Sequence, residues 1–191
     1  MQNSCMSDAL PTVSIHQRQH GVMTREQVAA YLQQELSLSE APVFVRSNKG
    51  RPQVQLESFD CNWSHSGELL AMAWSSQHRV GIDIEQVRPR PQWQRVAERF
   101  LLPAECAQLT DANDFLQLWV RKEALLKAIG QGLAHGLRFV EFAKAHGEWQ
   151  LQAVRPALDV PSDWNVRSLD ISEGYIGALA WRDRYTVAHD D

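Results

Sequence analysis

Leu69-Leu-Ala-Met-Ala-Trp74 is a short apolar run that recurs in similar form 107 positions later, as Ile176-Gly-Ala-Leu-Ala-Trp181. Each copy follows a turn of Ser, Gly and Glu, at residues 66–68 and 172–174. The repetition indicates two related halves that each close with a similar strand, although six apolar residues can also match by chance. We expect the first half to span residues 1–78 and the second half to span residues 79–191.

The composition is that of an ordinary globular protein. The 191 residues are 44% hydrophobic and 22% charged, and the net charge is -4. This charge argues against a general nucleic-acid binder, which needs a basic face. No apolar run approaches the roughly 18 residues of a membrane-spanning helix, and the first twenty residues do not resemble a secretory signal. We therefore expect a cytoplasmic protein that binds neither nucleic acid nor membrane, with Cys5, Cys61 and Cys106 as idle thiols.

Periodicity predicts three helices and at least two strands. Residues 24–36 repeat apolar side chains at helical spacing behind Thr24, a candidate N-cap. Residues 93–100 and 113–129 are also predicted helices, and Gly130 and Gly132 end the second of them. The apolar runs 69–74 and 80–84 flank the polar residues 75–79, which predicts two strands joined as a hairpin.

The most informative strand is Val80-Gly-Ile-Asp-Ile-Glu85. Alternate side chains of a strand point to opposite faces, so Asp83 and Glu85 emerge together while Val80, Ile82 and Ile84 face a core. Two neighbouring carboxylates repel each other unless a cation lies between them. A solvated strand face is nevertheless the more common reason for a D-x-E pattern.

A second informative segment runs from Trp119 to Gly130, at the end of the helix predicted over residues 113–129. Glu123 and Lys127 are four residues apart and share one face of this helix. Such a pair is among the commonest features of helix surfaces and says nothing about catalysis by itself. A further carboxylate and a lysine are, however, what a Mg2+-assisted phosphoryl-transfer site requires.

Two polar segments earlier in the chain could hold phosphate. Asn62-Trp-Ser-His-Ser-Gly67 is predicted to be a turn rich in hydrogen-bond donors, and Lys49-Gly-Arg-Pro52 is a basic turn before a strand. An incidental turn with polar residues is the more common explanation of residues 62–67 taken alone, and the basic turn is weak evidence by itself. A nucleophile and base adjacent in sequence, as at Ser64 and His65, rarely face each other, so a hydrolase pair is not expected.

Taken in order, these segments and Phe100-Leu-Leu-Pro-Ala-Glu105 resemble the 4'-phosphopantetheinyl transferase superfamily, in its single-chain, surfactin-synthetase-activating type. The resemblance covers residues 26–142. It implies an α+β, pseudo-dimeric fold of two halves, each a small antiparallel sheet packed with a helix, with coenzyme A between them.

The resemblance also implies roles for single residues. Asp83, Glu85 and Glu123 correspond to the Mg2+ ligands, and Lys127 corresponds to the contact with the coenzyme A pyrophosphate. Coenzyme A binding is further implied for the pair Ser64 and His65, for the turn Arg51-Pro52, and for Asp83. Lys122 and Glu105 match motif positions without a defined role. Members of the family often carry basic residues where this chain has Gln33 and Gln34, and Arg25, Arg46 or Arg51 is the candidate substitute.

The implied reaction moves phosphopantetheine from coenzyme A to a serine hydroxyl of an apo acyl or peptidyl carrier protein and releases 3',5'-ADP. Glu123 is the candidate base and Lys127 the second catalytic residue; the enzyme is expected to be a monomer. An acidic carrier needs a basic patch, and Arg88, Arg90, Trp93, Arg95 and Arg99 are the candidates, although they are equally consistent with an ordinary surface. The alternatives are a coenzyme A-binding module without catalysis and a metal-dependent phosphohydrolase.

Overall fold

The computed structural model describes residues 10–47, 50–130, 136–154 and 161–184. The fold is α+β, as predicted. Cys5, Lys49 and Gly132 lie outside the described residues. The first elements along the chain are β1 (Thr12–Gln17), α1 (Thr24–Glu35), β2 (Phe44–Arg46), β3 (Pro52–Val54), β4 (Asp60–Ser66) and β5 (Leu69–Ser75). The elements that follow are β6 (His78–Gln86), α2 (Trp93–Phe100), α3 (Pro103–Cys106), α4 (Ala112–Ile129), the short helix η2 (Leu137–Phe139), β7 (Val140–Ala145), β8 (Glu148–Val154), the short helix η3 (Pro161–Asp163), β9 (Asn165–Leu169) and β10 (Tyr175–Asp183).

The same arrangement of strands and helices occurs twice. One three-stranded antiparallel sheet has the order β1-β5-β4 and the other has the order β6-β10-β9. In each set a helix and a two-stranded hairpin, β2-β3 or β7-β8, lie between the first strand and the last two. The repeated apolar runs therefore form the central strands, β5 and β10, of their respective sheets.

The residue-by-residue match between the two runs does not hold. Met72 and Trp74 on β5 pack toward α1. Their counterparts in the sequence, Leu179 and Trp181 on β10, pack between the two sheets instead. Shifting a strand by one residue exchanges its two faces, so the repetition identifies equivalent strands and not equivalent side chains.

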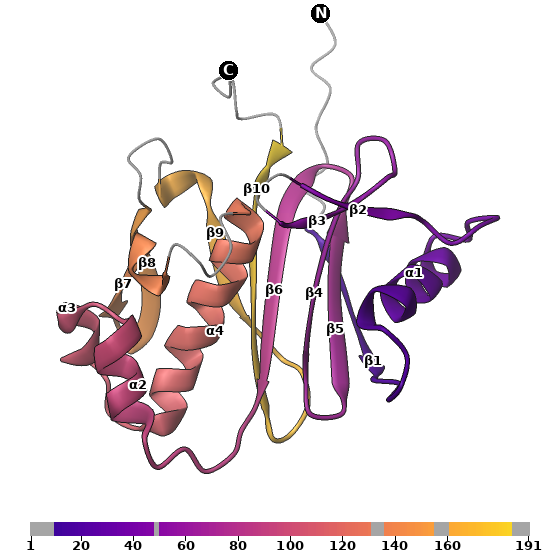
Figure 1. Cartoon of the computed structure of the whole chain (residues 1–191). Coiled ribbons are helices and arrows are strands. Elements are labelled where there is room, and N and C mark those ends of the chain that lie inside the picture. Colours follow the sequence, from indigo (N-terminus) through magenta and orange to yellow (C-terminus); the bar gives the residue numbers. More distant parts are fainter. Residues whose placement is uncertain (1–9, 48–49, 131–135, 155–160, 185–191) are drawn as a thin grey trace, which may run out of the picture.

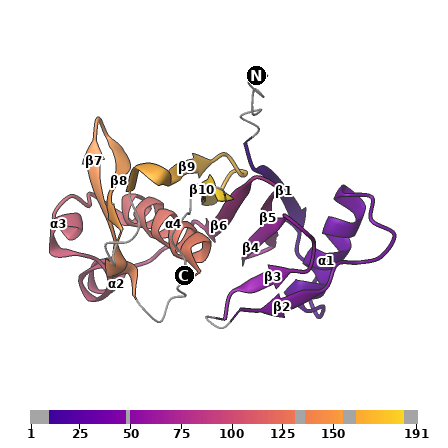
Figure 2. The same ribbon diagram turned by 90° about the horizontal axis from the view of Figure 1, so that it is seen from above.

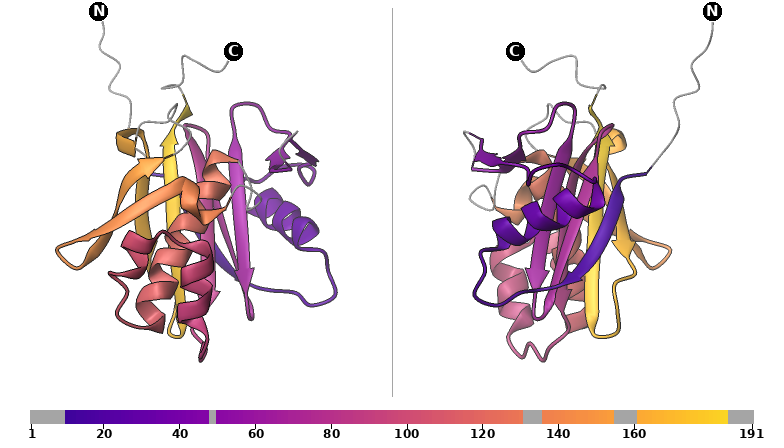
Figure 3. Two further views of the ribbon diagram at one scale, coloured as in Figure 1. Left: turned by 60° about the vertical axis from the view of Figure 1, so that its left-hand side comes forward. Right: turned by 90° about the vertical axis from the view of Figure 1, so that its right-hand side faces the viewer.

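The sheets and helices form four layers (Figures 1 and 2). Helix α1 covers the outer face of β4 and β5, where Val28 and Leu32 are fully buried (Figure 3, right). Alternate residues of β5, β6 and β10 form the core between the sheets, as predicted for Val80, Ile82 and Ile84. Helix α4 packs on the other face of β10 and builds the third core with the hairpin β7-β8. The site residues of β6 thus lie near the middle of the molecule.

Strands β4 and β6 meet through side chains. Three polar side chains of β4 accept hydrogen bonds from backbone N–H groups of β6, each from a residue twenty positions further along the chain. The pairs are Asp60 Oδ2 with Val80 N (2.8 Å), Asn62 Oδ1 with Ile82 N (3.0 Å) and Ser66 Oγ with Gln86 N (3.0 Å). The constant offset means that the two strands run in the same direction.

The predicted hairpin between residues 69–74 and 80–84 is wrong, although both strands exist. β5 pairs with β1 and β4, whereas β6 pairs with β10, so the short connection between β5 and β6 passes from one sheet to the other. Residues 69–74 are buried on both faces and already have a strand on each edge. Loop length alone favours a hairpin, and only these tertiary neighbours exclude it.

The predicted turn at residues 62–67 is also wrong. Asn62 to Ser66 belong to β4, and the chain reverses direction only after Ser66, where Gly67 takes a positive φ of 54°. Asn62, Ser64 and Ser66 are buried, and each forms hydrogen bonds with β6. The predicted helix at residues 24–36 is confirmed as α1, but its N-cap is Met23, and Thr24 is already helical.

Helix α4 begins and ends at specific residues. The Asp111 side chain caps its N-terminus by accepting a hydrogen bond from the backbone N–H of Asp114 (2.8 Å). Gly130 ends the helix with φ of 79°, as predicted. No helix in the described part of the chain is long and apolar enough to cross a membrane.

Candidate functional site

The candidate site lies where α4 crosses β6. A Cβ atom on Gly81 would lie 2.1 Å from the carbonyl oxygen of Ala124 and 2.5 Å from the backbone nitrogen of Ala128, so only glycine allows this approach. The contact brings α4 over the face of β6 that carries Asp83. Lys127 Nζ donates to Asp83 Oδ1 (2.8 Å) and to the Ile82 carbonyl (3.2 Å). The structure thus joins two motifs that the sequence separates by about forty residues.

Asp83 and Glu85 share one face of β6, as predicted, and both have hydrogen-bond donors from the protein. Ser64 Oγ donates to Asp83 Oδ1 (2.7 Å). Glu85 Oε2 accepts from Ser66 Oγ (3.0 Å) and pairs with Arg90 Nη2 (3.0 Å). Serines of β4 therefore hold both carboxylates of β6.

Glu123 lies beside this pair and is 6% exposed. Burial is the largest cause that raises the pKa of Glu123 to about 7, and the negative charges of Asp83 and Glu85 raise it further while Lys127 opposes them. Three carboxylates therefore share a region that Lys127 neutralises only in part. Such a cluster favours an added cation.

The chemical type of these side chains suits them as ligands of a hard divalent cation. Their oxygens are the donors that Mg2+ prefers, and the negative charges of Asp83 and Glu85 add to the burial that raises the pKa of Glu123. Among the residues that the structure describes, no three side chains already converge as a metal site. Asp83 instead contacts Ser64 and Lys127, and Glu85 contacts Arg90.

A cavity of about 410 Å³ adjoins the carboxylates. It brings together Arg51 and Pro52 of the basic turn with Glu123 and Lys127 of α4, four of the predicted site residues. Its remaining lining residues are Arg46, Gly50, Asn62, Trp63, Leu126 and Gly130. Arg46 is exposed at this cavity, whereas Arg25 does not line it. The cavity has room for a ligand that carries phosphate groups, and such a ligand would contact both halves of the chain.

The Arg51 side chain bonds within the protein, although the sequence indicated a ligand contact. The guanidinium group is buried, forms a two-pronged ion pair with Asp60, and donates to the carbonyls of Val80 and Lys127. The group that the basic turn appeared to offer to a ligand is thus used inside the protein.

His65 lies on the exposed side of β4. Partial burial of its ring is the main cause that lowers its pKa, followed by the positive charges of Arg18 and Lys127. Arg18 and Lys127 are therefore close enough to His65 for their charges to act on its ring. Arg18 was missed by the sequence reasoning because it follows β1 in a loop with no recognisable motif.

Lys122 and Glu105 form an ion pair whose side chains are both 0% exposed. Lys122 Nζ also donates to the carbonyls of Leu137 (2.9 Å) and Val140 (2.6 Å). Glu105 accepts from the backbone nitrogens of Leu102 and Phe142. These motif positions therefore hold α4, α3 and β7 together and do not face a ligand.

The predicted basic patch borders a second cavity, of about 340 Å³ and mostly apolar. Trp93, Phe115 and Trp119 line it, with Glu85 and Arg90 also among its lining residues. Arg95 and Arg99 are exposed on α2 nearby. This surface combines an apolar hollow with positive charge and lies next to the carboxylate cluster.

The fold and the site together define an α+β protein with a carboxylate and lysine cluster where two similar sets of elements meet. The family model of the 4'-phosphopantetheinyl transferase superfamily matches residues 79–180. The chain therefore belongs to this superfamily.

Curated relatives bear the same family name. The chain is 31% identical to the 4'-phosphopantetheinyl transferase AcpT of Salmonella typhi over 63% of its own length and 67% of the relative. It is 33% identical to HetI of Nostoc sp. over 62% of its length and 50% of the relative. It is 37% identical to psf-1 of Bacillus pumilus over 51% of its length and 44% of the relative. The matched regions thus span about half to two thirds of these relatives.

Proposed function

We propose that this protein transfers the 4'-phosphopantetheine group of coenzyme A to a serine hydroxyl of an apo acyl or peptidyl carrier protein, releasing 3',5'-ADP. The observation that carries the proposal is the cavity in which the basic turn at residues 50–52 faces Glu123 and Lys127. It supplies cationic and apolar walls for a nucleotide next to a carboxylate cluster. The relatives named 4'-phosphopantetheinyl transferases support the same activity.

The proposed division of labour follows the two sets of elements. Residues 1–78 supply contacts to coenzyme A through Arg51, Pro52, Ser64 and His65, and residues 79–191 supply Asp83, Glu85, Glu123 and Lys127. The division falls after the first residue of β6, just past the connection by which the chain passes from one sheet to the other. Arg46, exposed at the cavity, is the basic side chain best placed to add a phosphate contact.

In the proposed reaction the serine oxygen forms a bond to the phosphorus next to pantetheine, and the bond from that phosphorus to 3',5'-ADP breaks. Lys127 contacts the pyrophosphate oxygens and offsets the charge that develops on the leaving group. Glu123 is the group proposed to accept the serine proton as the new oxygen–phosphorus bond forms.

Asp83, Glu85 and Glu123 would hold the Mg2+ ion. When bound, Mg2+ supplies positive charge to the pyrophosphate oxygens. Ser64 and Ser66 keep Asp83 and Glu85 on the side of β6 that faces α4. The monomeric state and the cytoplasmic location remain predictions from the sequence.

The basic patch of Arg88, Arg90, Trp93, Arg95 and Arg99 is the proposed docking surface for the acidic helix of a carrier protein. It borders the apolar cavity beside Glu85, so a docked carrier would bring its serine close to the carboxylates. Charge reversal at Arg95 or Arg99 should weaken binding of the carrier protein and leave coenzyme A binding unchanged. Unaltered carrier affinity in both variants would remove this surface from the proposal.

Intact-mass spectrometry of an apo carrier protein tests the reaction directly. The carrier is incubated with this protein, coenzyme A and Mg2+, with EDTA in a parallel sample. We expect a mass gain of one phosphopantetheine that EDTA prevents, and that Asp83→Ala and Glu123→Gln nearly abolish at equal folded fraction. The exposed Glu57→Gln variant, which makes the same chemical change away from the site, should keep full activity.

Other outcomes distinguish the alternatives. No mass gain on any carrier, with coenzyme A binding intact, would indicate a binding module without catalysis. Release of nucleotide from coenzyme A without a carrier would indicate a phosphohydrolase. Full transfer by Asp83→Ala or Glu123→Gln would overturn the assignment of the carboxylates.

A further inference from the structure

The C-terminal end of α4 carries carbonyl groups that the helix cannot satisfy by itself. The last four carbonyls of any α-helix have no partner further along the helix. Here the Leu126 carbonyl accepts from the backbone nitrogen of Gly130 (2.9 Å). The carbonyls of Lys127, Ala128 and Ile129 remain, and the first of them belongs to the proposed pyrophosphate contact.

Two arginines from other elements satisfy all three carbonyls. Arg79 on β6 donates through Nε to Ala128 and through Nη2 to Ile129 (2.9 Å). Arg51 at the start of β3 donates through Nε to the Lys127 carbonyl (2.9 Å). Cations at this end of a helix also complement its dipole. The last turn of α4 is thus held by side chains from both sets of elements.

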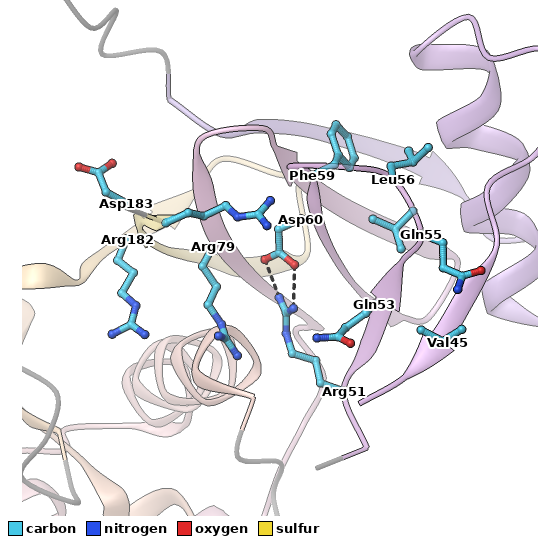
Figure 4. A pocket seen from close by; sticks show the side chains of 12 residues that line it. Val45, Arg51, Gln53, Gln55, Leu56, Phe59, Asp60, Arg79, Arg182 and Asp183 are labelled. Carbon is cyan, nitrogen blue, oxygen red and sulfur yellow. Dashed lines mark hydrogen bonds and ion pairs between the residues drawn. The ribbon is translucent and has the colours of Figure 1, made fainter. Parts of the chain in front are cut away.

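Arg51 is itself fixed by a buried partner. Its Nη1 and Nη2 atoms donate to the two carboxylate oxygens of Asp60 (2.7 and 2.8 Å), and Nη2 also donates to the Val80 carbonyl (2.7 Å). Asp60 in turn accepts from the Val80 nitrogen (2.8 Å). The side chains are only 7% and 12% exposed. Figure 4 shows both bonds of the pair, with Arg79 beside it.

Gly130 makes room for the two arginines. A Cβ atom there would lie 2.8 Å from Arg79 Nη2 and 3.2 Å from Arg51 Cδ. The residue that ends the helix is therefore also the one that lets both guanidinium groups reach its carbonyls. A lysine at position 51 has a single nitrogen, which cannot bond to Asp60, Val80 and Lys127 in this fork geometry.

We propose that Arg51, held by Asp60, is a positioning residue that acts through Lys127. The pair joins the turn at residues 50–52, strand β6 and the last turn of α4, and so keeps the Lys127 ammonium at Asp83. This inference rests on the proposed function. The aliphatic part of Arg51 still lines the cavity, but its guanidinium serves α4 and not the ligand.

Steady-state kinetics of Arg51→Lys separates positioning from ligand binding. We expect kcat to fall about tenfold while KM for coenzyme A changes less than twofold, because the loss lies in the geometry of Lys127. In a Lys127→Ala background, measured at high enzyme concentration, the same substitution should change kcat less than twofold, since the two residues act in series. Asp60→Asn should resemble Arg51→Lys.

Arg184→Ala is the matched control. Arg184 is exposed, lines a further cavity of about 580 Å³ on the other side of Arg51, and donates through its backbone nitrogen to the Gln77 carbonyl. It should leave kcat and KM unchanged. A rise in KM for coenzyme A with kcat intact in Arg51→Lys would make Arg51 a direct ligand and overturn the proposal. The proposal would also be overturned if the effects of Arg51→Lys and Lys127→Ala on kcat were fully additive.

Hydrogen exchange gives a readout that does not depend on activity. In Arg51→Lys and Asp60→Asn, the backbone amides of the last turn of α4 should exchange at least tenfold faster, while those of its first turn stay as in the wild type. Unchanged exchange would refute the positioning role of Arg51 and Asp60 even if the wild type transfers nothing to any carrier. Faster exchange together with an inactive wild type would support that role and reject the proposed function.

Discussion

Glu123→Gln should stabilise the folded protein at high pH while it removes activity. The carboxyl of Glu123 is buried beside Asp83 and Glu85, and its pKa is raised from an ordinary value of 4.5 to about 7. A raised pKa means that the folded state holds the proton more tightly than the unfolded chain does. The associated stability is complete below pH 4.5 and is lost as the pH rises through 7. Glutamine carries no charge at any pH, so the stability of the Glu123→Gln variant does not fall in this way as the pH rises.

The size of the effect follows from the two pKa values. One pKa unit corresponds to about 1.4 kcal/mol, so ionising Glu123 in the folded state costs about 3 kcal/mol at pH 8 and about 1 kcal/mol or less at pH 5. Glu123→Gln should therefore exceed the wild type in unfolding free energy by roughly 3 kcal/mol at pH 8. The gain should fall to about 1 kcal/mol or less at pH 5.

Urea unfolding followed by tryptophan fluorescence, at pH 5 and pH 8 with EDTA present, measures both differences. Glu57→Gln is the control, because Glu57 is exposed and its substitution should leave the pH dependence unchanged. Addition of Mg2+ at pH 8 should stabilise the wild type by about 1.4 kcal/mol at ten times the dissociation constant, and Glu123→Gln much less. If Glu123→Gln is no more stable than the wild type at pH 8, the inference that ionised Glu123 destabilises the fold beside Asp83 and Glu85 is refuted.

Three further substitutions test the framework around the site, each by urea unfolding. Lys122→Met should cost about 3–5 kcal/mol because it leaves the buried Glu105 unpaired, and an added Glu105→Gln should recover part of the loss; a cost near zero would contradict the pair. Gly81→Ala should cost about 3 kcal/mol or more, since its Cβ would strike the Ala124 carbonyl, and tolerance of alanine would show that α4 can move away. Asp111→Ala should cost about 1 kcal/mol as a lost N-cap; no change would mean that water replaces the carboxylate.

Local periodicity was sufficient to predict most of the elements. The helix over residues 93–100 coincides with α2, and α4 differs by one residue from its prediction at 113–129. These helices have an apolar stripe, and α4 also has clear end signals. Strand pairing could not be predicted in the same way, because β5 is buried on both faces and its neighbours come from distant parts of the chain.

The buried polar side chains of β4 explain the mistaken turn at residues 62–67. Asp60, Asn62, Ser64 and Ser66 recur at every second position, which is the period of a strand. Polar residues usually face solvent, so a local reading assigns them to a loop. Their partners are the backbone and carboxylates of β6, which are twenty residues away and become visible only in the fold.

The resemblance to a known family, and not local periodicity, placed Asp83 and Lys127 in one site, since about forty residues separate them. Lys127 and Asp83 were expected together and meet at 2.8 Å. The interaction between Arg51 and Asp60 was not expected, because nothing in a basic turn indicates that its guanidinium is buried. Arg18 lies in a loop and becomes relevant only through its charge near His65.

The segment around residues 122–127 combines two tasks on opposite sides of α4. Lys122 points into the protein and pairs with Glu105, whereas its neighbour Glu123 lies by the carboxylates of β6. An ionised Glu123 opposes folding, so α4 needs compensating attachments to stay on β6. The structure supplies one near its middle, at Lys122, and another at its end, through Arg51. A site built from mutually repelling carboxylates thus depends on buried charges that never contact the ligand.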